Sequence, residues 1–174
     1  MKSDPVQKLI RISLLIALEI VLSRFLSIST PHLKIGFAFV PLALCAMLYG
    51  PVWAGTAGAL ADFLGAILVP IGPYFPGFTL TNCLAGILFG LCLRRERSDR
   101  WGFILLAVGL KGLCLSLLLN TLWISMLYGT PYLVLLPTRV FQCAVEMPVQ
   151  IIVLRILGNR HLQDALAGHT IAQS

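Results

Sequence analysis

Long apolar runs, separated by short polar or proline- and glycine-rich connections, dominate the chain. An α-helix needs about 20 apolar residues to cross a bilayer. Runs of that order lie near residues 8–27, 52–70, 78–94, 102–127 and 138–157. A shorter apolar piece at 37–49 contains Pro41, which predicts a short or broken sixth helix. The pattern predicts an all-α, polytopic membrane protein folded as a six-transmembrane-helix bundle.

The composition excludes a water-soluble globule, because 58% of the residues are hydrophobic and only 11% are charged. We therefore expect one membrane domain over residues 1–174, with 158–174 as a cytoplasmic tail. No small-residue cleavage pattern closes the first apolar run, so we expect no removable signal peptide.

Positive charge predicts the orientation, because Lys and Arg near short loops stay in the cytoplasm. The basic residues that flank apolar runs are Lys2, Lys8, Arg11, Arg94, Arg95, Arg97, Arg100, Arg155 and Arg160. All can be cytoplasmic only if the number of spans is even. Six spans with both termini in the cytoplasm follow. Orientation also explains the net charge of +6 better than nucleic acid does.

The sequence lacks the motifs of several kinds of metal site and enzyme. The five cysteines, Cys45, Cys83, Cys92, Cys114 and Cys143, lie in apolar runs without CxxC spacing, so we expect buried small side chains and no metal site, disulfide or cofactor. The chain has no P-loop, HExxH or G-x-S-x-G motif. We therefore expect no enzyme, and any ATP-driven function requires a partner.

An outward connection at 69–79 combines three prolines and two glycines with aromatic side chains. The aromatics Tyr74, Phe75 and Phe78 suit a lid that stacks on a flat ring; the alternative is an interfacial aromatic belt. Thr79 ends this connection, and Asn82 follows Phe78 at helical spacing, so an amide and an aromatic share one face.

A polar stripe on the last span consists of Arg139, Gln142, Glu146 and Gln150. A charge at the bilayer centre costs about 2.5–3.5 kcal/mol unless it faces protein or a wet cavity, so the stripe must point inward. The alternative to a binding site is an ion-pair network that only locks the bundle.

Further candidate groups lie toward the outer side. Asn120 and Trp123 offer an amide and an aromatic face three residues apart. Arg24 and Lys34 add positive charge, although Arg24 also suits snorkelling to the interface. The remaining intramembrane charges are Glu19, Asp62 and Lys111, for which we expect buried partners. Together, the aromatic, amide, carboxylate and cationic side chains toward the outer side suit a ligand that consists of a flat polar heterocycle and an anionic tail.

Small residues recur at four-residue spacing, which lets helices approach closely in lipid. The pairs are Ser13 and Ala17; Ala57, Ala61 and Gly65; Gly86 and Gly90; and Gly112 and Ser116. These small residues could serve packing within the bundle or docking to another membrane protein, and the sequence leaves both interpretations open.

Nearly the whole chain resembles the S components of energy-coupling factor transporters, within them the folate-specific group. The resemblance rests on Ala61-Asp62-Phe63-Leu64-Gly65, on Gly72-Pro73-Tyr74-Phe75-Pro76-Gly77-Phe78-Thr79-Leu80, and on Gly86 and Gly90. The regions around Phe25 and Leu33-Lys34-Ile35-Gly36-Phe37 are also similar.

The resemblance implies a vitamin-binding subunit of a prokaryotic plasma membrane, with an outward pocket closed by the first and third loops. It also implies a transmembrane coupling protein and two cytoplasmic ATPases as partners, with Ser13 and Ala17 packed on the coupling protein. The family commonly has alanines there, and Ser13 departs from that pattern.

The hypothesis that follows is a high-affinity folate site. The pterin ring would stack on Tyr74, Phe75, Phe78 or Trp123, with Thr79 nearby, and bond to Asn82, Asn120 or Glu146. The glutamate tail would meet Arg24, Lys34 or Arg139. The alternatives are an S component for riboflavin, thiamine or a pyridoxine-like vitamin, a small membrane enzyme with Glu146 or Asp62 as base, and a structural helper subunit.

Overall fold

A computed structural model describes residues 5–29, 34–94 and 100–159. Its helices are α1 (Pro5–Arg24), α2 (Phe39–Tyr49), α3 (Pro51–Leu68), α4 (Pro76–Cys92), α5 (Trp101–Leu110), the π-helix η1 (Lys111–Asn120), α6 (Thr121–Tyr128) and α7 (Tyr132–Leu157). Because α5, η1 and α6 follow one another without a break, they form one continuous rod. The described part of the chain is therefore the predicted bundle of six helical rods.

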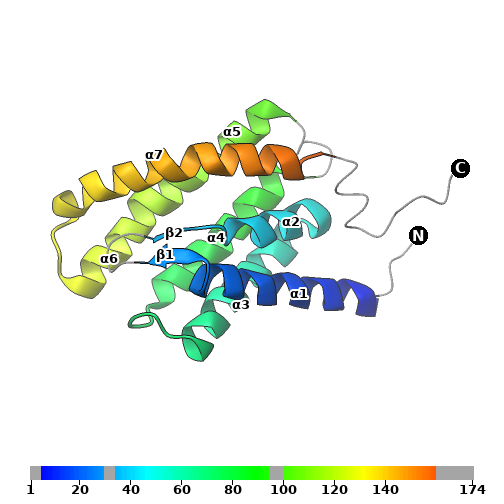
Figure 1. The fold of residues 1–174 in the computed structure, drawn as a ribbon, viewed down its shortest axis with the longest axis horizontal. Helices are drawn as coiled ribbons and strands as arrows, with labels where there is room; N and C mark the ends of the chain where they lie inside the picture. The colour runs from blue at the N-terminus through cyan, green and yellow to red at the C-terminus, as the bar shows by residue number, and fades with distance from the viewer. Residues whose placement is uncertain (1–4, 30–33, 95–99, 160–174) are drawn as a thin grey trace, which may run out of the picture.

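The connection between α1 and α2 is a small hairpin, which the sequence pattern did not predict. Its strands are β1 (Ser27–Ser29) and β2 (Lys34–Gly36), paired antiparallel with Ser27 opposite Gly36. A Cβ at Gly36 would lie 2.6 Å from the Cβ of Ser27, so only glycine fits this pairing. In Figure 1 the hairpin and α6 lie at one end of the bundle, opposite the N-terminal end of α1 and the C-terminal end of α7.

Helix α2 is too short to cross a bilayer alone, since its 11 residues span about 16 Å. Pro41 lies in its first turn, where the missing N–H needs no partner. Residues 41–47 are all buried, and α2 packs against α1, α3, α4 and α7. Other helices cover this short helix, and it forms the centre of the core.

Helix α7 begins at Tyr132, whereas the sequence predicts a start near 138. Pro137 lies inside the helix, as does Pro148. Membrane helices tolerate such prolines where neighbouring groups satisfy the freed carbonyls.

Small residues bring α3 and α4 into close contact. A Cβ at Gly86 would lie 2.3 Å from the carbonyl oxygen of Ala54, and one at Gly90 would lie 2.2 Å from the Cα of Pro51. These glycines therefore serve internal packing. Ser13 and Ala17, in contrast, are exposed on α1.

The outer surface of the bundle is apolar. Large side chains such as Val52, Leu133 and Leu14 are 72%, 77% and 69% exposed. Among the described residues, α3, the rod at Trp101–Tyr128 and α7 are each long and apolar enough to cross a membrane. The protein is embedded in the membrane, and these side chains face lipid.

Candidate functional site

A cavity of about 380 Å³ lies toward the end of the bundle that carries the hairpin. Its wall includes residues of α1, α3, α4, η1, α6 and α7, together with the connection between α3 and α4. The predicted site residues in this wall are Arg24, Tyr74, Phe75, Phe78, Asn82, Asn120, Arg139 and Glu146. Residues that are far apart in the sequence thus meet around one cavity.

Of the other predicted site residues, Thr79 and Trp123 are described by the structure but are not part of the wall. Thr79 lies behind it, bonded to Asp62 and Tyr74. Trp123 also lies behind it and packs against Phe75. The backbone of Lys34 lies in β2, but its side chain is outside the described residues.

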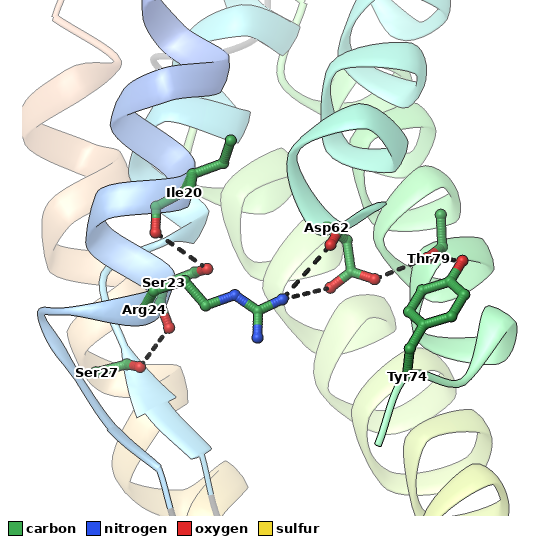
Figure 2. Close-up of polar contacts among 7 residues, drawn as sticks. All are labelled: Ile20, Ser23, Arg24, Ser27, Asp62, Tyr74 and Thr79. Carbon is green, nitrogen blue, oxygen red and sulfur yellow. Dashed lines mark hydrogen bonds and ion pairs between the residues drawn. The ribbon is translucent and has the colours of Figure 1, made fainter. Parts of the chain in front are cut away.

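A chain of polar contacts connects α1, α3 and α4 at the cavity wall (Figure 2). Nη2 of Arg24 lies 3.9 Å from Oδ1 of Asp62 and donates to the backbone oxygen of Asp62 at 3.5 Å. The Thr79 hydroxyl donates to Oδ2 of Asp62 at 2.8 Å and lies 3.0 Å from the hydroxyl of Tyr74. Asp62 is therefore the partner of Arg24, and the same network holds Tyr74 of the lid.

A second ion pair crosses from η1 to α7. Nζ of Lys111 donates to Oε1 of Glu146 at 3.0 Å, and Nε2 of Gln150 donates to the same oxygen at 2.6 Å. Nζ of Lys111 also lies 5.7 Å from the centre of the Phe39 ring. Both of these hydrogen bonds use Oε1 of Glu146, so among the described residues its Oε2 remains available to a further donor.

Arg139 is the cavity cation that lacks a carboxylate partner within the described part of the chain. Its side chain is 4% exposed, and Nη1 donates to Oε1 of Gln142 at 2.7 Å. Its Nε is buried without a hydrogen-bond partner among the described residues, as are Nε of Arg24 and Oδ1 of Asn120. Buried polar groups are normally hydrogen-bonded, so these three atoms mark the wall as a place where a polar ligand could bind.

Aromatic contacts fix the lid. The Phe75 ring lies 6.1 Å from that of Phe78 in an edge-to-face arrangement and 5.6 Å from that of Trp123. The indole of Trp123 donates to the Thr81 hydroxyl at 3.1 Å. A Cβ at Gly77 would lie 2.6 Å from both Phe75 and Trp123, so the glycine permits this packing. Trp123 thus supports the ring that faces the cavity.

The cavity, its lid and its uncompensated cation are those of a subunit that binds a small polar ligand. Residues 7–158 match the family described as ECF transporter, substrate-specific component. The chain belongs to this family.

Several proteins that are similar to this S component have the name FolT. A folate transporter FolT from Clostridium novyi (strain NT) is 40% identical over 161 residues, covering 92% of each chain. A folate transporter FolT from Leuconostoc mesenteroides is 31% identical, covering 90% of this chain and 86% of the relative. A crystal structure of FolT bound with folic acid matches with a TM-score of 0.83 and 36% identity, covering 87% of this chain and 92% of that one. The chain is a transport subunit and not an enzyme.

The predicted site left out four charged or amide residues of the wall of this S component: Glu19, Asp62, Lys111 and Gln142. Three of them are charged residues inside membrane spans, and the fourth belongs to the stripe on α7. An intramembrane charge is itself a signal of a functional site. That signal would have included them, although it does not name their partners.

One prediction about the cysteines was wrong. Cys114 is exposed on η1, whereas Cys45, Cys92 and Cys143 are buried. An apolar run predicts contact with an apolar medium, and on the outer face of a bundle that medium is lipid.

Proposed function

We propose that this chain is the folate-binding S component of an ECF transporter, which captures folate outside the cell and delivers it inward with an ATP-driven coupling module. Membership of the family supports a transport subunit, and the two relatives named folate transporters support the vitamin. The cavity volume of about 380 Å³ also falls within the roughly 300–1,000 Å³ of small-molecule sites.

The observation that carries the proposal is a set of buried polar atoms, on residues of the cavity wall, that have no hydrogen-bond partner among the described residues. A guanidinium at Arg139 and an amide oxygen at Asn120 are buried without full partners among the described residues. Burying an unpaired polar group costs roughly 1–3 kcal/mol. A ligand with an anionic group and N–H donors would remove that cost.

The cavity residues suit the two halves of folate. Tyr74, Phe75 and Phe78 offer ring faces and edges for stacking on the flat pterin. The open oxygen of Glu146, with the amide of Asn82, suits paired N–H donors. Arg139 then holds a tail carboxylate, since guanidinium and carboxylate form paired hydrogen bonds. Arg24 and Lys34 contribute further positive charge at the same end.

Folate binding is tested by calorimetry on the purified protein. Arg139→Gln removes the charge, and we expect the affinity for folic acid to fall about 10-fold or more, since a bond to a charged group contributes about 1.5–3 kcal/mol. The matched control is Arg94→Gln, an exposed arginine outside the cavity wall, which should leave the affinity within twofold. Unchanged affinity in Arg139→Gln would remove this residue from the site.

The identity of the vitamin is tested by competition. Labelled folic acid bound to the unmodified protein should resist a 100-fold excess of riboflavin, thiamine or pyridoxine and be displaced by unlabelled folic acid. Displacement by one of the other vitamins at equal concentration would assign the S component to that vitamin.

The exposed small residues on α1 suit a contact with the coupling protein, because small side chains let helices approach closely in lipid. We expect Ser13→Trp/Ala17→Trp to abolish co-purification of the coupling protein and ATPases and to leave folic acid binding intact. Leu18→Trp is the control, since Leu18 is also exposed but points about 100° away from Ala17. Loss of the complex only in the control would exclude the assigned face.

The orientation with both termini in the cytoplasm, in a prokaryotic plasma membrane, is tested in a cysteine-free background. A cysteine from Pro70→Cys should react with an impermeant maleimide in intact cells. A cysteine from Arg94→Cys should react only after permeabilisation. Reaction of both in intact cells would contradict the six-span topology.

A further inference from the structure

The middle of the fifth rod is a π-helix, η1, over the ten residues Lys111–Asn120. In a π-helix each N–H bonds to the carbonyl five residues earlier, so the turn is wider than in an α-helix. Such segments are rare and most are single-turn bulges, frequently at functional sites. Here the segment extends over more than one turn and lies in the cavity wall.

The wide turn decides which side chains of η1 face the cavity. The wall residues of η1 are Lys111, Leu115, Ser116 and Asn120. Lys111 and Asn120 are nine residues apart, which is two and a half turns of an α-helix and would place them on opposite faces. A π-turn takes roughly four and a half residues, so nine residues make about two full turns and both face the same way.

The residues on the other side of the rod agree with this geometry. In an uninterrupted α-helix, positions 115, 118 and 122 would share a face with Lys111. In the structure, Leu118 and Leu122 are instead 53% and 36% exposed, and Leu118 does not contact the cavity. An α-helix would therefore turn Leu118 inward and the Asn120 amide toward lipid, where an unbonded amide is costly.

We infer that the π-helix η1 is a positioning element of the binding site: it turns the Asn120 amide toward the ligand while Lys111 keeps its bond to Glu146. Asn120 is thereby a specificity-determining residue, whose side-chain oxygen has no hydrogen-bond partner among the described residues and receives an N–H donor of the ligand. The identity of that ligand as folate rests on the proposed function, whereas the geometry of η1 does not.

The geometry is tested by cysteine labelling without ligand. Single cysteines are introduced into the cysteine-free chain by Ser116→Cys, Leu118→Cys, Asn120→Cys and Leu122→Cys, and the protein in liposomes is treated with a charged thiosulfonate. We expect positions 116 and 120 to react at least about 10-fold faster than 118 and 122, because only the former face the cavity. Faster reaction at 118 or 122 than at 120, or reaction at none of the four, overturns the inference.

The role in specificity is tested by moving the amide. Asn120→Leu should lower the affinity for folic acid about 5- to 10-fold. The double variant Leu118→Asn/Asn120→Leu should bind as weakly, because position 118 faces away from the cavity. Leu118→Asn alone is the control and should bind within twofold of the unmodified protein.

Restored affinity in the double variant, or unchanged affinity in Asn120→Leu, would overturn the assigned role of Asn120. Failure of the unmodified protein to bind folic acid would instead overturn the proposed function. The labelling pattern would still decide the geometry of η1.

Discussion

The ion pair between Lys111 and Glu146 makes a quantitative prediction about stability. The two side chains are 17% and 14% exposed, so solvent screens them little, and they connect η1 to α7. Removing one partner of a buried pair typically destabilises by about 3–5 kcal/mol, because the other charge is left uncompensated. We expect this loss for Lys111→Met, which leaves the Glu146 carboxylate with only the Gln150 amide.

Glu146→Gln should have a smaller effect, about 1.5–3 kcal/mol, since an amide oxygen still accepts a hydrogen bond but carries no charge. The double variant Lys111→Met/Glu146→Gln leaves no buried charge at this place. It should therefore be more stable than the sum of the single effects predicts, by at least about 1.5 kcal/mol.

Thermal unfolding in detergent, followed by tryptophan fluorescence, measures these differences. A loss of 3–5 kcal/mol corresponds to a melting temperature lower by about 6–20 °C for a chain of this size. Additive effects, within about 0.5 kcal/mol, would refute the reasoning, because independent residues add and a coupled pair does not.

Two further predictions concern packing and the lid. Gly90→Ala should destabilise the bundle by about 1–3 kcal/mol in the same melting assay, because the new Cβ meets the backbone of Pro51, whereas Gly109→Ala has open space and should not. An equal effect of the two variants would contradict the close approach of α3 and α4. Thr79→Val removes the hydroxyl that connects Asp62 and Tyr74, so hydrogen exchange in the loop at 69–75 should accelerate while the melting temperature changes by less than about 2 °C. Unaltered exchange in that loop would mean that other contacts hold the lid.

Much of the candidate site was visible in the sequence because its signals are local. The aromatics and prolines of the lid are neighbours along the chain, and the stripe on α7 follows from helical spacing. The structure buries that stripe, with Arg139, Gln142 and Gln150 each at most 4% exposed. Trp123 is not a wall residue but packs against Phe75, which is one. Helical spacing cannot show this, because it gives the face of a helix on which a residue lies and not the side chains packed against it.

The sequence by itself determined that lipid surrounds the protein, how many helical rods it has and which residues are too polar to face lipid. Each of these depends on short stretches of chain and on the free energy of transferring their side chains from water to lipid. Tertiary structure alone decided the partners: Asp62 for Arg24 and Glu146 for Lys111, across 38 and 35 residues. It also decided that the fifth rod widens into η1, since counting at 3.6 residues per turn places Asn120 opposite Lys111. Pairing and helix phase depend on which surfaces meet in three dimensions, and no local pattern carries that information.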